Sequence, residues 1–272
     1  MILVNGQPED SINVLDRGLQ YGDGLFETIA FRDGKAEFLQ SHLSRLYRGC
    51  EQLKIATQQL ETQLNAEIKQ ICDDLTDNAV IKIIITRGQG GRGYRTQADN
   101  IPTRIISTHE ITKYPKENSQ GIKVRFCQQT LSENASLAGI KHLNRLEQVL
   151  ARAEWSDDDI AEGLMFNNQQ QLIEGTMSNV FIVKDGKLLT PELNLSGVAG
   201  IMRQQVISCA QNAGIDVIET VLTQQDVKNA EEVFITNSLI NIWPITEIEN
   251  FSIYAHGEIT QILQNTIYNL EK

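Results

Sequence analysis

Hydrophobic residues in the first third of the chain follow two periods, one typical of helices and one typical of strands. Apolar positions recur every three or four residues from Leu39 to Leu53, which predicts a helix with one buried face. A second helix is expected over 60–75. Short apolar runs flank Asp33-Gly34 and predict a β-hairpin, because both turn residues tolerate a positive φ.

The segment from Ala79 to Thr86 is rich in β-branched residues and predicts a strand buried on both faces. Apolar spacing from Ile140 to Ala153 predicts a helix face, and Gly200 precedes another predicted helix. Strands and helices are mixed rather than regularly alternating, which favours the α+β class. Further strands are expected over 1–4, 101–108, 122–127, 163–167, 180–183, 188–189 and 232–236.

A glycine-rich segment interrupts this pattern between Arg87 and Tyr94. Four glycines occupy positions 88, 90, 91 and 93, and no regular helix or strand suits that density. We expect a loop that brings its backbone close to a ligand. Nucleotide binding is a weak interpretation, because the segment lacks the lysine and hydroxyl residue of a P-loop.

The length of 272 residues suits one large domain or two small ones. The polar stretch over 112–119, which contains Pro115, is the best candidate for a linker. We therefore expect a small N-terminal domain over 1–112, a linker over 113–120 and a larger C-terminal domain over 121–272.

Composition and charge narrow the function classes. Hydrophobic residues make up 41% of the chain and charged residues 22%, which is ordinary for a globular protein. The net charge of −11 argues against nucleic-acid binding, which needs clustered lysine and arginine. The apolar start is too short for a signal peptide, and no run approaches the length that spans a bilayer, so we expect a cytoplasmic protein without membrane partners.

The four cysteines show no paired spacing and no nearby histidine at the spacing of zinc ligands. We interpret them as reduced, mostly buried thiols and predict no metal site.

Four short motifs occur in a fixed order along the chain. They are His42-Leu43-Ser44-Arg45-Leu46, Gly139-Ile140-Lys141-His142-Leu143-Asn144-Arg145-Leu146-Glu147-Gln148, Glu174-Gly175-Thr176-Met177-Ser178-Asn179-Val180-Phe181 and Gly200-Ile201-Met202-Arg203. Together they resemble the class IV, branched-chain-aminotransferase-like family of pyridoxal 5′-phosphate (PLP) enzymes of fold type IV. The resemblance extends from Asp16-Arg17 to Pro244. It implies a two-domain α+β fold, with a small N-terminal α/β domain and a larger C-terminal domain that has a barrel-like sheet.

The resemblance assigns Lys141 as the lysine that bonds covalently to PLP and then moves protons at the reacting carbon. The alternative is a solvated surface lysine, but the small, apolar stretch from Leu137 to Ile140 is an unusual approach to one. Glu174 matches the carboxylate that keeps the pyridine nitrogen of PLP protonated. The alternative is a surface glutamate in a turn, which the following Gly-Thr-Met-Ser-Asn makes less favourable.

The phosphate of PLP is a dianion, and the resemblance implies that several groups of this chain bind it. The backbone amides of Ile201 and Met202 match the positions at a helix N-terminus, where free N–H groups and the dipole favour anions. Arg45 matches a guanidinium that binds phosphate, against the alternative of a solvated helix residue. Ser238 matches a hydroxyl position, although Asn237-Ser238 departs from the Gly-Thr or Ser-Thr of the aminotransferases. Asn179 and Ser178 add hydrogen bonds around the ring.

Within the family, the sequence is most similar to aminodeoxychorismate lyase. Branched-chain aminotransferases carry a tyrosine where this chain has Leu146, and an arginine in the first hairpin that 26–30 lacks. The resemblance implies conversion of 4-amino-4-deoxychorismate to 4-aminobenzoate, a folate precursor, and pyruvate. Lys141 is the expected base, and Lys141 or Thr28 the acid that protonates the departing side chain.

The substrate carries two carboxylates, and the local cations are Arg92, Arg95 and Arg145, with Tyr94 placed to contact the ring. Solvated arginines are the alternative at each of these positions. Two other functions stay open: a D-amino-acid or branched-chain aminotransferase of the same fold, and a PLP-binding protein without activity. The resemblance also implies a homodimer.

Overall fold

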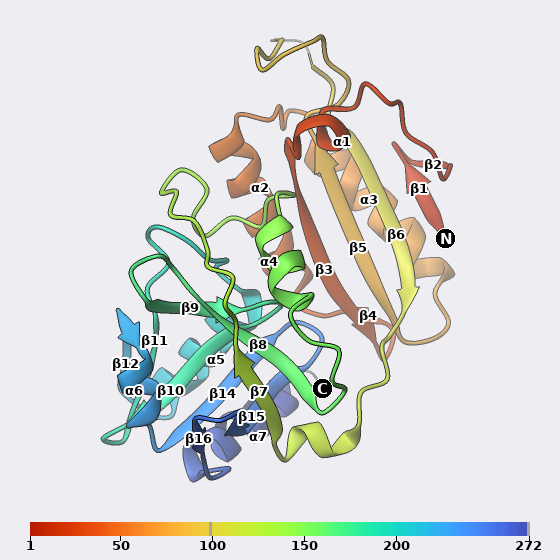
Figure 1. The fold of residues 1–272 in the computed structure, drawn as a ribbon. Coiled ribbons are helices and arrows are strands. Elements are labelled where there is room, and N and C mark those ends of the chain that lie inside the picture. Colours follow the sequence, from red (N-terminus) through yellow and green to blue (C-terminus); the bar gives the residue numbers. More distant parts are fainter. Residues whose placement is uncertain (98–99, 271–272) are drawn as a thin grey trace. The chain divides into compact units, whose positions relative to one another are not determined.

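A computed structural model describes residues 1–97 and 100–270 and divides the chain into two compact units (Figure 1). The first unit comprises Met1–Thr112 together with Ile140–Asn144, and the second comprises Lys113–Gly139 and the chain from Arg145 on. The segment Ile140–Asn144 therefore groups with the first unit, although it follows the expected linker and the sequence analysis assigned it to the C-terminal domain.

The first unit contains a six-stranded antiparallel sheet in the order β2-β1-β6-β5-β3-β4. The predicted hairpin, both long helices and the strand over 79–86 are confirmed. The elements are β1 (Ile2–Val4), β2 (Gln7–Pro8), α1 (Arg17–Tyr21), β3 (Gly24–Arg32), β4 (Lys35–Ala36), α2 (Leu39–Leu53), α3 (Leu60–Asp74), β5 (Ala79–Thr86) and β6 (Thr103–Glu110).

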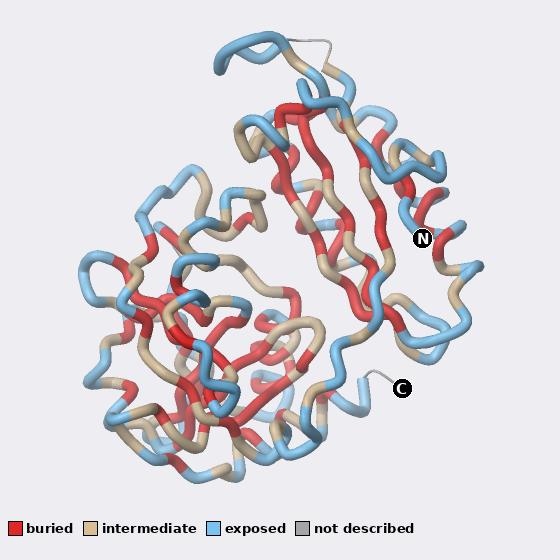
Figure 2. Tube along the Cα trace, turned by 45° about the vertical axis from the view of Figure 1, so that its right-hand side comes forward, coloured by how far each residue is buried: buried red, intermediate tan, exposed pale blue. Residues whose placement is uncertain are grey.

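Helices α2 and α3 cover one face of this sheet. Gly49 of α2 packs against Leu25 of β3, and Glu67 of α3 pairs with Arg104 of β6. Buried and half-buried residues consequently alternate along the strands (Figure 2). The expectation that β5 is buried on both faces was wrong, because Lys82 and Ile84 on its other face are only half-buried.

The second unit contains a ten-stranded sheet, in the order β12-β11-β10-β14-β15-β7-β8-β9-β13 with β16 paired to β15. Strand β9 also lies near β10 and β11, so the sheet is nearly closed into the expected barrel. The elements are η1 (Lys116–Ser119), β7 (Ile122–Phe126), α4 (Leu146–Arg152), β8 (Ile160–Phe166), β9 (Gln171–Gly175), β10 (Asn179–Lys184), β11 (Lys187–Pro191), α5 (Ile201–Asn212), β12 (Val217–Thr220), β13 (Leu222–Thr223), α6 (Gln224–Lys228), β14 (Glu232–Asn237), β15 (Asn241–Ile248), β16 (Ser252–Ile253) and α7 (Glu258–Leu270).

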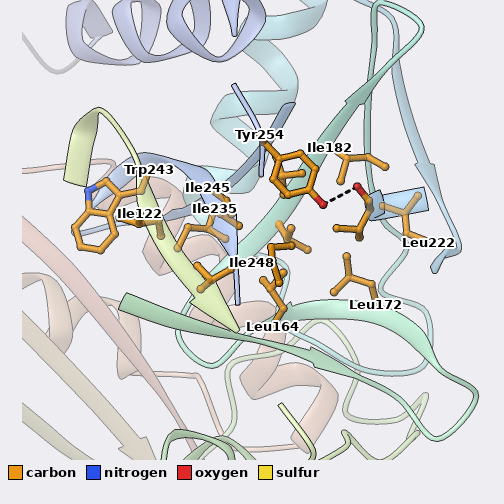
Figure 3. Packing of buried hydrophobic residues seen from close by; sticks show 14 of the residues in the cluster. Ile122, Leu164, Leu172, Ile182, Leu222, Ile235, Trp243, Ile245, Ile248 and Tyr254 are labelled. Atoms are coloured by element: carbon orange, nitrogen blue, oxygen red, sulfur yellow. Dashed lines mark hydrogen bonds between the residues drawn. The ribbon is translucent and has the colours of Figure 1, made fainter. Parts of the chain in front are cut away.

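Apolar side chains from most of these strands form one core inside the curved sheet (Figure 3). The Tyr254 hydroxyl lies in this core and donates a hydrogen bond to the backbone carbonyl of Val227 at 3.0 Å. The fully buried members include Val124, Leu164, Val180, Ile182, Ile235 and Ile245. Helices α5 and α7 pack on β14 and β15.

The helix expected from Ile140 to Ala153 begins only at Leu146. Residues 140–145 are not helical, and 141–143 pair with the edge of β3 instead. The apolar spacing also misidentified a buried face, because Leu146, Val149 and Leu150 are exposed. Part of the expected linker is likewise ordered as η1.

All four cysteines are free. Burial raises the pKa of Cys50 and of Cys127 to about 12, so these two thiols stay protonated at neutral pH. Within residues 1–97 and 100–270, the structure contains no helix with the length and apolar character needed to cross a bilayer.

We predict that Phe234→Ala lowers the free energy of unfolding by about 3–5 kcal/mol, because it leaves a cavity in the core. Phe234 is fully buried and its ring stacks on Phe181 with 5.0 Å between centroids. Ile253→Ala is the control, since this side chain is 81% exposed and its loss should cost less than about 0.5 kcal/mol. Urea unfolding measures both, and equal midpoints for the two variants would contradict the prediction.

Candidate active site

Lys141 lies on a short segment that extends the sheet of the first unit. The Phe26 amide donates to the Lys141 carbonyl at 2.9 Å, and the Leu143 amide donates to the Gly24 carbonyl at 3.0 Å. Leu25 and His142 stand opposite each other in this antiparallel pairing. Backbone hydrogen bonds therefore fix the position of Lys141, as a β-sheet fixes any of its residues.

The side chain of Lys141 lies on the half-covered face of the sheet. Its Nζ is 4.2 Å from the centroid of the Phe26 ring, a distance typical of a cation–π contact. Thr28 shares this face, since residues two apart on a strand point the same way. The structure thus places both residues proposed for proton transfer on one face of the sheet, and their roles stay predictions.

Lys82 is a cation on the same face that the sequence analysis did not single out. It pairs in register with Thr28, and its Nζ lies 5.8 Å from the centroid of the Phe26 ring. A lysine inside an otherwise apolar strand run was the signal that could have identified it.

Arg45 is buried on α2 and bonded to Glu27 of β3, which excludes the alternative of a solvated helix arginine. Arg45 Nε donates to Glu27 Oε1 at 2.8 Å, and His42 Nδ1 lies 2.7 Å from Glu27 Oε2. A carboxylate only accepts hydrogen bonds, so Nδ1 of His42 carries the proton. A guanidinium has five N–H donors, so its pairing with Glu27 is compatible with a further acceptor such as phosphate.

Burial and the neighbouring charges shift the pKa values of Glu27 and His42. Burial works to raise the pKa of Glu27, but Arg45 and His42 outweigh it and hold that pKa below its ordinary value. Burial is also the largest cause acting on His42, and it lowers the pKa of the imidazole despite the hydrogen bond to Glu27. The positive charges of Arg45 and Lys141 act in the same direction as burial. His42 is therefore neutral near pH 7.

The segment Tyr21-Gly22-Asp23-Gly24, at the end of α1, packs against the segment that carries Lys141. Gly22 adopts a left-handed conformation at the end of α1, and a Cβ there would lie 2.5 Å from the amide oxygen of Asn144. Asn144 in turn donates to the Gly22 carbonyl at 3.1 Å. Only glycine fits this approach of the segment that carries Lys141.

The glycine-rich segment is a loop, as expected, and α1 holds its backbone. Buried Arg17 donates to the carbonyls of Gly93 and Tyr94 at 3.0 and 3.4 Å, and the Tyr21 hydroxyl accepts from the Gly93 amide. The Tyr94 ring meets the Tyr21 ring edge-on but is 84% exposed, and Arg92 is exposed. Their proposed contacts with substrate stay predictions.

In the second unit, Glu174 is buried near the end of β9, which excludes the alternative of a surface turn glutamate. Its Oε2 accepts from the Val198 amide at 2.8 Å, and its Oε1 accepts from Gln148 Nε2 at 3.3 Å. Asn179, at the start of β10, donates from Nδ2 to the Val198 carbonyl at 2.8 Å. One residue, Val198, therefore connects both side chains assigned to the cofactor ring.

The N-terminus of α5 has the features of an anion site. Its cap residue Gly200 is extended and supplies no side-chain hydrogen bond to the first-turn amides, which include those of Ile201 and Met202. A Cβ at Gly200 would lie 2.0 Å from Asn179 Oδ1, so only glycine leaves room for this contact. The residues present thus fit a phosphate group bound at this helix end.

Ser238 follows β14, whose register pairs Thr236 with Asn179. The preceding Asn237 closes the turn, because its Oδ1 accepts from the amides of Leu239 and Ile240. This local role accounts for asparagine at the position where the sequence departs from the aminotransferases. Arg145 is half-buried at the start of α4, and its proposed contact with substrate stays a prediction.

Comparison with known proteins identifies the family. The model of the family described as amino-transferase class IV matches residues 24–248. The chain therefore belongs to the class IV aminotransferase family, and its fold is the one this family shares.

Three relatives are similar over nearly their full length. An aminodeoxychorismate lyase from Vibrio harveyi is 38% identical, covering 98% of this chain and 99% of the relative. The crystal structure of a 4-amino-4-deoxychorismate lyase from Pseudomonas aeruginosa matches with a TM-score of 0.95 and 41% identity, covering 99% of this chain and 98% of that one. A putative branched-chain-amino-acid aminotransferase from Methanocaldococcus jannaschii is 33% identical, covering 97% and 93%.

The buried, neutral His42 predicts a specific pH dependence of stability. Its pKa is lower in the folded chain than its unfolded value of about 6.5, so the unfolded state binds the proton more readily. Stability from this residue is present above about pH 6.5 and is lost as pH falls toward the folded pKa. His42→Gln should therefore show a smaller loss of melting temperature between pH 7 and pH 5 than the wild type. His109→Gln, at an exposed position, is the control, and identical slopes for all three proteins would contradict the prediction.

Proposed function

We propose that this chain is a PLP-dependent carbon–oxygen lyase that converts 4-amino-4-deoxychorismate to 4-aminobenzoate and pyruvate. The full-length similarity to two lyases carries the proposal, at 38% identity in one case and with a TM-score of 0.95 in the other. The backbone pairing of Lys141 with β3 supports it, because a covalent cofactor lysine needs a fixed position.

PLP supplies an electron sink that stabilises negative charge on the carbon bearing the substrate nitrogen. Glu174 is assigned to keep the pyridine nitrogen protonated, and its burial in a fixed hydrogen-bond setting suits that task. The first-turn amides of α5 at Ile201 and Met202, with Arg45 and Ser238, are assigned to the phosphate. Asn179 completes the contacts around the ring.

Lys141 is assigned as the base. With PLP bound, the amine of Lys141 would remove the proton from the substrate carbon that bears the nitrogen. The C–O bond to the enolpyruvyl group then breaks, and the ring becomes aromatic. Lys141 returns a proton to the departing group, which leaves as pyruvate. Thr28 is the second candidate for this acid, because it shares the sheet face on which Lys141 lies.

The substrate carboxylates need cations, and the candidates now number four. Arg92, with Tyr94, lies on a loop whose backbone Arg17 holds, and Lys82 lies on the sheet face of Lys141 and Thr28. Arg95 and Arg145 are the remaining candidates.

The proposal includes a homodimer in the cytoplasm as the working form. The family resemblance supports the homodimer, and size-exclusion chromatography with light scattering measures it.

The main alternative is an aminotransferase, favoured by the 33% identity to a putative branched-chain enzyme. A half-reaction separates the two functions. With an amino acid alone, an aminotransferase converts bound PLP to the pyridoxamine form, whereas a lyase should not.

The direct test supplies purified protein and PLP with enzymatically generated 4-amino-4-deoxychorismate and assays both products. Equal amounts of 4-aminobenzoate and pyruvate are expected. Neither product, from protein that still shows the visible absorption of covalently bound PLP, would overturn the lyase. A non-catalytic PLP-binding protein would give neither product and no half-reaction.

We predict that Lys141→Ala folds normally but loses the visible absorption and lowers turnover by at least about 100-fold, the lower bound for a general base. Normal folding is expected because backbone groups, which alanine retains, hold this segment. Lys69→Ala is the control, since its side chain is 74% exposed. Activity of Lys141→Ala equal to that of the control would contradict the assignment of Lys141 as the catalytic base.

For Arg45 we predict that Arg45→Lys weakens PLP binding about tenfold, as the loss of one charge-assisted hydrogen bond implies. Lysine keeps a charge beside buried Glu27 but not the fork geometry, whereas alanine would leave that carboxylate unpaired and destabilise the fold. Arg32→Lys, which alters another arginine–glutamate pair of the first unit, is the matched control. Equal PLP affinities in a fluorescence titration of the apoproteins would contradict the role.

A further inference from the structure

Glu162 of β8 is buried beneath the turn that joins β9 to β10, and it has no part in the roles assigned so far. Its exposed fraction is 1%, yet its carboxylate accepts five hydrogen bonds from neutral donors. The donors are the amides of Gly163, Thr176 and Met177 at 2.8, 3.1 and 3.1 Å, and the hydroxyls of Thr176 and Ser178 at 2.5 and 2.8 Å.

The turn is folded tightly around this carboxylate. The Gly175 amide donates to the Ser178 carbonyl at 2.7 Å, and a Cβ on Gly175 would lie 2.2 Å from the Ser178 hydroxyl and 2.9 Å from Glu162 Oε2. Glycine is therefore required at 175, and the hydroxyls of Thr176 and Ser178 are used inside the protein. The Gly-Thr-Met-Ser part of the motif is thus built to enclose Glu162.

This turn lies between the residues assigned to the cofactor. Glu174 immediately precedes it and Asn179 immediately follows it, and Val198 receives a hydrogen bond from one of them and donates to the other. The Met177 carbonyl also accepts from Asn237 Nδ2 at 3.1 Å, which ties the turn to the residue before Ser238. Movement of the turn would therefore displace Glu174, Asn179 and, through Asn237, Ser238, which are three residues of the proposed cofactor site.

A buried carboxylate is costly unless every oxygen is hydrogen-bonded. Glu162 meets that condition only while the turn keeps its closed form, so the cost of burial opposes opening of the turn. We infer that Glu162 is a positioning residue that holds Glu174 and Asn179 in place for the PLP ring. This inference rests on the proposed function, because it assumes that Glu174 binds PLP.

The test measures the PLP affinity of the apoprotein for wild type, Glu162→Gln and Glu174→Gln. In Glu162→Gln an amide donor replaces one acceptor and faces N–H or O–H groups of the turn, leaving buried donors unsatisfied. We expect the dissociation constant for PLP to rise about tenfold, the effect of one such lost bond. The pH midpoint of the visible absorption of bound PLP should also shift, as it should in Glu174→Gln.

Glu232→Gln is the matched control. Glu232 is also buried in the second unit, and its carboxylate accepts from the amides of Ile259 and Thr260 and the hydroxyl of Thr260, at the start of α7. It should lose stability as Glu162→Gln does while binding PLP normally. Equal PLP affinities and equal pH midpoints for the two variants would show that Glu162 only stabilises the fold, and would overturn the inference.

Two further variants keep the inference falsifiable if Glu162→Gln does not fold. Thr176→Val removes one hydroxyl donor to Glu162 and keeps the carboxylate. The dissociation constant for PLP should therefore rise about threefold, which corresponds to the loss of one weak hydrogen bond. In the Glu174→Gln background the effect of Thr176→Val on PLP affinity should be smaller, because Asn179 is then the remaining ring contact that the turn positions, and an undiminished effect there would overturn the inference. A wild-type protein that does not bind PLP would instead overturn the proposed function and the inference with it.

Discussion

The candidate site depends on the backbone pairing between β3 and the segment that carries Lys141. Two hydrogen bonds, from Phe26 to Lys141 and from Leu143 to Gly24, extend the sheet by one short stretch. Because successive residues of a strand point to opposite faces, this register alone directs Lys141 toward Phe26 and Thr28. A shift by one residue would send the amine to the face that α2 covers.

Buried carboxylates organise both units of this acidic chain. Glu27 pairs with Arg45 and His42, and Glu67 pairs with Arg104. In the second unit the buried Glu162, Glu174 and Glu232 accept mainly from backbone amides and hydroxyls. A carboxylate offers about four acceptor positions and no donor, so it can gather amides from several segments at once. Each of these glutamates therefore holds together segments that are far apart in the sequence.

Local patterns predicted the helices whose periodicity reflects their burial, including α2, α3 and α5. The β-branched run of β5 predicted a strand there, although not its burial on one face. The prediction failed at 140–145, where an apolar spacing of three and four suggested a helix but the open edge of β3 offered hydrogen bonds to an extended chain. That competition is decided by tertiary pairing, which periodicity does not record. Tertiary contacts also explain why the apolar residues of α4 are exposed. Their spacing fits a helix face, but in the described part of the unit no element covers that face. Strand β15 and helix α7 were not predicted from the sequence.

Motif resemblance singled out Lys141, Glu174 and the α5 N-terminus, and their roles toward the cofactor stay predictions. It did not identify Lys82, Glu27 or Glu162, because isolated charged residues within strands have no local pattern. What distinguishes them is the set of partners that the fold brings to them.

The two hydrogen bonds of Val198 have an evolutionary consequence. Because Glu174 and Asn179 both hydrogen-bond to the backbone of one residue, a substitution at either changes the setting in which the other is selected. Neighbouring residues that share a partner have non-additive effects, so the order in which they mutate matters. The path by which such a site acquires a different reaction is therefore constrained at Val198, although its own side chain makes none of these contacts.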